Sequence, residues 1–167
     1  MISAAYCREM ARYNAWQNTG LREAMLALPE REVTAERGAF FGSLLGTANH
    51  LLWGDTMWMS RFDGWAPPSV PGKESAAFMA DAQSWAAARL EADARIGAWA
   101  VGLGEADLAG TLTWYSGAAG RELSKSRAVC IVQFFNHQTH HRGQIHKMLT
   151  ELGHRPGDTD FFLMPDP

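Results

Sequence analysis

The fold of this chain of 167 residues is decided by the stretch Phe134-Phe135-Asn136-His137-Gln138-Thr139-His140-His141-Arg142-Gly143-Gln144-Ile145. Steps of three and four residues, the period of one α-helix face, connect a set of expected inward positions: Cys130, Phe134, His137, His141, Ile145, Met148 and Leu152. His137 and His141 lie one turn apart on this stripe, so their rings can converge on one point. His140 falls on a different stripe, which is expected to face solvent.

Two imidazoles buried on one helix face need partners, because an unpaired buried polar group costs roughly 1–3 kcal/mol. A metal ion would satisfy both, since neutral imidazole is the commonest metal ligand and an i, i+4 pair presents two ligands from one backbone. The alternative is a pair of core histidines that hydrogen-bond to other side chains. A metal site also requires a third ligand from elsewhere in the chain.

His50 is the candidate for that third ligand. It lies mid-helix in an apolar segment, with Gly46 and Gly54 four residues away on either side. These small neighbours leave room beside the imidazole for another helix or an ion. A lone histidine of this kind is more often a satisfied core residue, but together with His137 and His141 a three-histidine site between facing helices is the simpler interpretation.

The remaining two histidines fit the site less well. His146 lies about 180° around the helix from His137, so the two cannot share a site. His154 follows the helix-ending Gly153 and is expected at the surface, where the helix dipole favours a histidine.

Composition limits the classes of protein to consider. A content of 47% hydrophobic residues in 167 predicts one domain, 1–167, with ample core material. The net charge of −3 gives no electrostatic reason to expect nucleic-acid binding. Cys7 and Cys130 are far apart and favour buried thiols in a reducing compartment over a disulfide framework. No signal peptide and no membrane-spanning run is evident, so a cytoplasmic protein is expected.

Helical periodicity and Pro/Gly breaks predict four long helices. Their expected limits are about 3–28, 39–62, 74 or 75 to 102 or 104, and 125–152. The Pro- and Gly-rich loop after residue 62 is long enough to cross from one end of a bundle to the other. Residues 111–115 and 121–124, around the turn 116–120, favour a small β-hairpin. The predicted fold is all-α: an antiparallel four-helix bundle with a long crossover between the second and third helices and a hairpin before the fourth.

Large apolar side chains are expected to face the core, among them Phe40 in the second predicted helix and Leu90 in the third. The apolar tail 160–164 is expected to dock on the bundle. The second helix and the tryptophan-rich surface carry more large apolar residues than four helices usually bury. We therefore expect a homodimer.

Two blocks of the sequence resemble the DinB-like (DinB/YfiT) family. SLLGTANHLLWGD (43–55), followed by Trp58 and Arg61-Phe62, looks like the second helix of that family, and NHQTHHRGQ (136–144) looks like its last-helix signature, NHxxHHRGQ. ARYNAW (11–16) resembles the usual opening. The resemblance implies an antiparallel four-helix bundle with a long crossover, and it implies metal ligation by His50, His137 and His141, which the stripe analysis also selects.

The chemistry of such a site follows from its ligands. Three neutral nitrogen ligands leave coordination positions for water or substrate, which is typical of catalytic rather than structural sites. Imidazole ligation suits zinc or nickel and is compatible with iron, copper or manganese. Family members with assigned activities are mostly metal-dependent transferases or isomerases that use a small cellular thiol. The resemblance therefore implies S-transferase or isomerase chemistry on a small-molecule substrate, with a low-molecular-weight thiol as cosubstrate. The alternatives are a non-catalytic metal- or small-ligand-binding module and a metal-dependent hydrolase.

Other polar residues of the two blocks have two interpretations each. Arg142 either pairs with Asp55 or a neighbouring carboxylate and so joins the two histidine-bearing helices, or it is solvated. Asn49 and Gln138 either orient imidazoles or are ordinary surface amides. Four tryptophans are either walls of a substrate pocket or core residues: Trp53, Trp58, Trp65 and Trp114.

Overall fold

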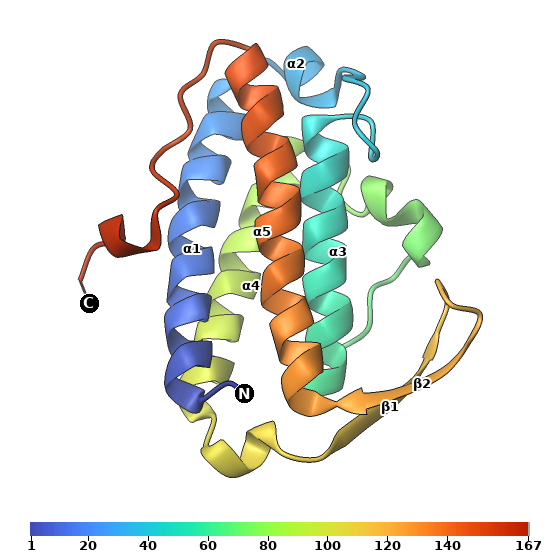
Figure 1. Cartoon of the computed structure of the whole chain (residues 1–167). Helices are drawn as coiled ribbons and strands as arrows, with labels where there is room; N and C mark the ends of the chain where they lie inside the picture. Colours follow the sequence, from blue (N-terminus) through green and yellow to red (C-terminus); the bar gives the residue numbers. More distant parts are fainter. Residues whose placement is uncertain (167) are drawn as a thin grey trace.

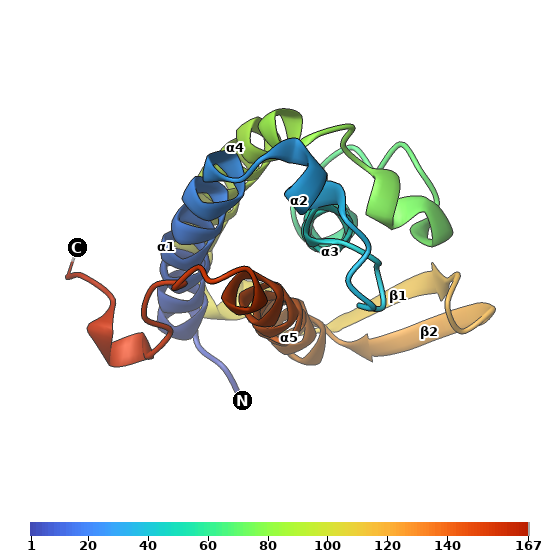
Figure 2. The same ribbon diagram turned by 90° about the horizontal axis from the view of Figure 1, so that it is seen from above.

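The computed structural model describes residues 1–166, and its four long helices form a bundle (Figure 1). These helices are α1 (Ala4–Ala27), α3 (Leu44–Phe62), α4 (Ala82–Gly102) and α5 (Arg127–Glu151). The closest pairs are α1 with α4 and α3 with α5, and both pairs run antiparallel. Viewed from above, the four helices enclose a common interior (Figure 2). The predicted four-helix bundle is confirmed.

The long crossover between α3 and α4 is also confirmed. Both helices run in the same direction, so residues 63–81 return along the length of the bundle (Figure 1). This segment contains the short 3₁₀ helix η1 (Gly72–Ala77). Asn49 of α3 holds it in place, because its Nδ2 donates to the carbonyl oxygens of Ala76 and Met79, each at 2.9 Å.

The predicted hairpin precedes α5. Strands β1 (Thr111–Ser116) and β2 (Arg121–Ser126) pair antiparallel and follow the 3₁₀ helix η2 (Glu105–Leu108). Gly120 in the turn has φ +63°, a conformation that favours glycine. The hairpin packs beside α3, where the Trp114 ring lies edge-on to Trp58 with centroids 5.6 Å apart (Figure 1).

The second long helix begins later than the predicted Ala39. Gly42 adopts φ +76°, which interrupts a helix, and α3 starts at Leu44. The Ser43 hydroxyl then caps it by accepting a hydrogen bond from the Gly46 amide at 3.0 Å.

The third long helix also begins later than predicted, at Ala82 instead of residue 74 or 75. A capping box between Asp81 and Ser84 sets that start. A further short helix, α2 (Glu30–Thr34), follows Pro29 and was not predicted. Five residues are too few for a periodic pattern to be recognised in the sequence.

Two predicted core residues, Phe40 and Leu90, are exposed, at 87% and 55%. Phe40 lies in the turn before α3, so helical periodicity does not apply to it. Leu90 follows Arg89, whose buried guanidinium occupies the inward face of α4 at that level. Both predictions were wrong. At Phe40 an irregular turn, and at Leu90 a buried ion pair on the inward face of the helix, override the helical period of apolar residues.

The C-terminal segment does pack on α1. Phe161, in the 3₁₀ helix η3 (Phe161–Leu163), stacks on Tyr13 with ring centroids 5.1 Å apart. The Tyr13 hydroxyl donates to the carbonyl oxygen of Thr159 at 2.7 Å. Within residues 1–166, none of the helices has the length and apolarity that a membrane crossing requires.

Candidate metal centre

The structure brings His50 of α3 together with His137 and His141 of α5. One ring nitrogen from each lies within 4.8 Å of those of the other two. The Nε2 atoms of His50 and His137 are 3.1 Å apart. The two helices that the sequence predicted to face each other therefore present all three imidazoles to one point in the bundle.

Two glycines of α3 make this approach possible. A Cβ on Gly54 would lie 2.9 Å from Cε1 of His137, so only glycine leaves room for that ring. A Cβ on Gly46 would lie 2.1 Å from the carbonyl oxygen of Phe41. That close passage lets the Phe41 ring stack on His50, with centroids 3.8 Å apart and planes 17° from parallel.

Hydrogen bonds orient two of the rings. Nδ1 of His141 lies 2.7 Å from Oε1 of Gln144, which can only accept, so this nitrogen carries the proton and Nε2 keeps its lone pair. Nδ1 of His50 lies 2.9 Å from the Ser75 hydroxyl of η1. Such contacts on the far nitrogen commonly orient metal-binding histidines. Nδ1 of His137 is buried and has no hydrogen-bond partner within residues 1–166.

The surroundings keep the imidazoles neutral. Burial, followed by the proximity of His137 and His141, lowers the pKa of His50 to about 3. Burial, followed by His141 and His140, lowers the pKa of His137 to about 4. Burial also lowers the pKa of His141, against the opposing hydrogen bond to Gln144. Three neutral rings with converging nitrogens are the form that binds a cation.

The geometry fits a divalent ion. With metal–nitrogen bonds of about 2.0–2.1 Å, the 3.1 Å separation of the His50 and His137 nitrogens corresponds to an angle of about 100° at the metal, between octahedral and tetrahedral values. The widest separation, 4.8 Å, exceeds the roughly 4.2 Å that two such bonds span, so a small side-chain adjustment must accompany binding. An all-imidazole donor set suits zinc and nickel.

A cavity of about 220 Å³ adjoins the histidines. His50, Gly54 and His137 line one part of it, and the rest is formed by side chains of α3 and by the hairpin: Trp53, Met57, Trp58, Arg61, Trp114, Ser116, Gly117 and Ala118. Larger cavities lie elsewhere on the described part of the chain, but none of them is lined by these histidines. An ion at the three histidines would therefore face a pocket with apolar walls.

Three of the four candidate tryptophans line this cavity. The exception is Trp65, which is buried and donates its Nε1 hydrogen to the Asp63 carboxylate at 2.8 Å. The interpretation as pocket walls therefore fits Trp53, Trp58 and Trp114, and the interpretation as a core residue fits Trp65.

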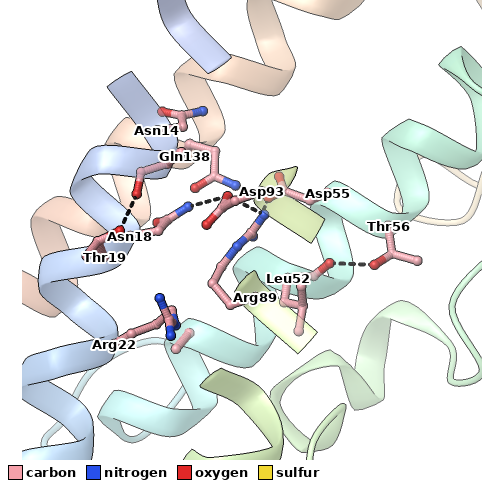
Figure 3. A network of polar contacts seen from close by, with 12 residues as sticks. Asn14, Asn18, Thr19, Arg22, Leu52, Asp55, Thr56, Arg89, Asp93 and Gln138 are labelled. Carbon is pink, nitrogen blue, oxygen red and sulfur yellow. Dashed lines mark hydrogen bonds and ion pairs between the residues drawn. The ribbon is translucent and has the colours of Figure 1, made fainter. Parts of the chain in front are cut away.

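Other residues of the two sequence blocks form a separate buried network (Figure 3). Asp55 of α3 pairs with Arg89 of α4 at 2.6 Å and accepts a hydrogen bond from Gln138 of α5. Arg142 donates to Asn14 of α1 at 2.7 Å and to Gln138 at 3.3 Å. This network joins all four long helices.

Both interpretations of Arg142 are thus corrected, because within residues 1–166 it forms no ion pair with Asp55 or another carboxylate, and it is buried. The amides also differ from expectation. Asn49 binds the crossover and Gln138 binds the network, so neither touches an imidazole and neither is a surface amide.

Sequence reasoning missed Phe41, Ser75 and the role of Gln144. Gln144 stands three residues after His141, and that spacing alone places two helical side chains together. Ser75 lies 25 residues from His50 in an irregular segment, so no local pattern connects them. Phe41 lies in a turn, where side-chain direction has no period.

Comparison with known proteins agrees with this fold. The sequence matches the DinB family over residues 1–167. Its structure is similar to that of YfiT from Bacillus subtilis, a probable metal-dependent hydrolase with an unusual four-helix bundle topology. The TM-score is 0.65 at 15% identity, over 93% of this chain and 92% of that one, and at this identity the likeness establishes the fold alone. No curated protein matches the sequence. Because the family match spans the whole chain, this protein belongs to the DinB family.

Proposed function

We propose that this protein is a metal-dependent enzyme in which His50, His137 and His141 hold a divalent ion and a low-molecular-weight thiol attacks a small electrophilic substrate. The observation that carries this proposal is the cavity lined by His50 and His137, two of the three clustered histidines. A structural metal ion is usually enclosed by protein ligands, whereas a catalytic ion keeps a coordination position open and needs space beside it for the reactants.

The lining of the cavity favours a thiol over water as the nucleophile. Apart from the two ligand histidines it holds no carboxylate, lysine or tyrosine, so no side chain there is placed to act as a general base. A bound divalent ion would supply Lewis acidity that deprotonates a coordinated thiol outright. A thiol, whose ordinary pKa is about 8.5, needs less assistance than water to become a nucleophile.

The chain's own residues perform three tasks in this proposal. Ser75 and Gln144 orient the rings of His50 and His141, so only a small adjustment of the side chains is needed when the ion binds. Phe41 covers the face of His50 and reduces access of water from that side. Trp53, Met57 and Trp58 give the pocket apolar walls that suit the carbon skeleton of a small substrate.

A metal-dependent hydrolase is the second candidate. It is supported by the structural similarity to YfiT, whose description is that of a probable metal-dependent hydrolase. In that case water takes the place of the thiol. A non-catalytic metal-binding module is the third candidate, in which the ion mainly joins α3 to α5.

The test is turnover by tag-free protein loaded separately with zinc, nickel, iron or manganese. Chlorodinitrobenzene with cysteine, glutathione or coenzyme A reports S-transfer, and nitrophenyl esters report hydrolysis. His141→Ala removes a proposed ligand, while His140→Ala is the matched control because His140 is adjacent but exposed. The proposal predicts thiol-dependent turnover that is lost in His141→Ala and retained in His140→Ala.

The other outcomes separate the candidates. Ester hydrolysis that needs the metal but no thiol would favour the hydrolase. No turnover with any substrate, together with a melting temperature that falls on chelation, would favour the binding module. Equal turnover in His141→Ala and the wild type would rule out a role for the metal.

The homodimer also remains a prediction. Light scattering on the purified protein at several concentrations would decide it.

A further inference from the structure

Arg61 lies in the same cavity as the histidines, toward the C-terminal end of α3. It is 11 positions after His50, three helical turns on, and therefore on the same face of the helix. The corresponding rise is about 16 Å between the two backbone positions. A Cβ on Gly54 would lie 2.9 Å from Cε1 of His137, so the His137 ring lies beside Gly54, seven positions before Arg61. Seven residues rise about 10 Å along a helix, so the two ends of the pocket are separated by roughly 10 Å, or two turns of helix.

The guanidinium is positioned by aromatic side chains. Its central carbon lies 4.9 Å from the centroid of the Trp58 ring on α3 and 5.3 Å from that of Trp114 on β1. These contacts fix the plane of the arginine side chain between the helix and the hairpin. They also leave its N–H groups at the edge of the plane, where a ligand can reach them.

Those N–H groups have no protein acceptor. Within residues 1–166, Arg61 forms no ion pair and donates no hydrogen bond, although it is half-buried. Other half-buried or buried arginines of this chain do find acceptors: Arg37 binds the Glu32 carboxylate and Arg127 binds the carbonyl oxygen of Phe62. Arg61 is therefore a partly desolvated cation that lines the cavity and has no counter-charge among residues 1–166.

The net charge of the cavity lining also favours an anionic ligand. Among residues 1–166, Arg61 is the only formally charged residue in the lining of the cavity, and no aspartate or glutamate contributes to it. A divalent ion on three neutral histidines would raise the positive charge further. Such a pocket attracts an anion and disfavours a cationic substrate. Arginine is well suited to the partner, since its planar fork forms two parallel hydrogen bonds with a carboxylate or a phosphate.

We propose that Arg61 is the anion-binding subsite of this pocket, and that the natural substrate or cosubstrate is an elongated molecule with a carboxylate or phosphate group about 10 Å from its reacting atom. This inference rests on the proposed function for the identity of the reacting end. It gives Trp58 and Trp114 a second role, because they hold the guanidinium ready for the anion.

The competing explanation is that Arg61 is a strut that ties the hairpin to α3 through its two indole contacts. Arg95 supplies the matched control. Its guanidinium lies 3.9 Å from the centroid of Trp65, but it is exposed and lies outside this cavity. A role in tryptophan packing is shared by both arginines, whereas an anion subsite belongs to Arg61 alone.

The experiment measures binding by calorimetry to tag-free, zinc-loaded protein. The probes are ω-mercaptohexanoate, the corresponding ω-mercaptoalkyl phosphonate, and the neutral ω-mercaptohexanol, all of which can bind zinc through sulfur. The wild type is expected to prefer the anionic probes over the alcohol by about ten- to a hundredfold. Arg61→Gln should reduce this preference to about onefold, Arg61→Lys should retain part of it, and Arg95→Gln should leave it unchanged. Which anion binds more tightly distinguishes a carboxylate substrate from a phosphate.

A second measurement does not depend on the metal. Hexanoate is titrated into metal-free protein while the indole N–H signals of the tryptophans are followed by NMR, with hexanol as the neutral comparison. Hexanoate should shift the Trp58 and Trp114 signals in the wild type and in Arg95→Gln, but not in Arg61→Gln.

The outcomes separate the two proposals. Hexanoate binding at Arg61 in a protein that neither binds metal nor turns over substrate would retain the subsite and reject the proposed function. The same preference for anions in Arg61→Gln as in the wild type would overturn the subsite. So would a loss of thermal stability in Arg61→Gln that is accompanied by no carboxylate preference in the wild type, since that result would identify a strut.

Discussion

Two clusters of polar side chains lie between α3 and α5, and they are built differently. The buried network around Asp55 contains two cations and two anions. Arg89 pairs with Asp93 at 2.8 Å as well as with Asp55 (Figure 3). Arg142 donates to the amide oxygens of Asn14 and Gln138. The histidine centre is neutral and faces a cavity. One cluster pairs its charges internally, and the other brings ring nitrogens of three neutral histidines together without any charged partner.

Neighbouring residues of one sequence block belong to different clusters and therefore have different roles. In residues 136–144, His137 and His141 belong to the centre, while Gln138 and Arg142 belong to the network. The network joins four helices and so fixes how α5 sits against α3. The centre depends on that placement, because its three nitrogens come from both helices. We therefore expect network variants to lose stability and centre variants to lose metal.

The largest expected effect is on stability. Arg89→Met leaves Asp55 and Asp93 without their cation in a buried site, which should lower the free energy of unfolding by about 3–5 kcal/mol. Urea denaturation measures this. Arg95→Met is an exposed change on the same helix that removes only the contact with the Trp65 ring, so it should lower the free energy of unfolding by no more than about 1 kcal/mol. Similar values for the two variants would show that the network is not a stabilising element.

The second effect is on metal affinity. His137→Ala removes a proposed ligand, so the affinity for zinc should fall by more than about a hundredfold, beyond what the loss of a supporting contact causes. The unfolding free energy of the metal-free protein should change far less than in Arg89→Met. Competition with a chromogenic chelator gives the affinity, and His140→Ala is the control. A hundredfold loss in His140→Ala as well would contradict the division into inward and outward histidines.

A smaller effect on zinc affinity tests whether the His137 ring needs the space beside Gly54. In Gly54→Ala the new Cβ, 2.9 Å from Cε1 of His137, must displace that ring, so zinc affinity should fall by about 10- to 100-fold. Gly97→Ala on α4 meets no atom within 4 Å and is the matched control. It should gain up to about 1 kcal/mol of stability from helix propensity without changing affinity. Unchanged affinity in Gly54→Ala would show that the position of His137 is not critical.

The smallest effect is on pH dependence. The pKa values of His50 and His137, about 3 and about 4 in the folded protein, lie below the roughly 6.5 of an unfolded chain. At pH values between about 4 and 6.5 the unfolded state therefore binds more protons than the folded state. The stability of the metal-free protein should decline as pH falls through this range. Urea denaturation across this range shows the slope. The double variant His50→Ala/His137→Ala should have a shallower slope, and an unchanged slope would assign the dependence to other groups.

Periodicity was enough to predict the bundle and the shared face of His137 and His141, and the glycines beside His50, together with the family resemblance, predicted that His50 would join them. His137 and His141 share a helix face whatever the details of packing, and Gly54 indicated a close approach on α3. Pro and Gly residues after Phe62 predicted the crossover. These features depend on local geometry, which the sequence contains directly.

The contacts that support the site were not predictable in this way. Asp55 pairs with Arg89, 34 positions later in the chain, and His50 hydrogen-bonds to Ser75 in the crossover. Both contacts depend on how the elements pack in the folded protein. The exposure of Phe40 and the position of Phe41 over His50 follow from a turn centred on Gly42, where neither the helix nor the strand period applies. The three histidines could be predicted from the sequence pattern, whereas the residues that hydrogen-bond to them and stack on them could not.

The most direct test of the account is the metal content of tag-free protein, purified without chelators and dialysed against metal-free buffer. Elemental analysis should find about one divalent ion per chain in the wild type and in His140→Ala, and almost none in His141→Ala, which has lost one of three ligands. A wild-type protein that holds no metal, and whose melting temperature does not rise when zinc, nickel, iron or manganese is added, would contradict it.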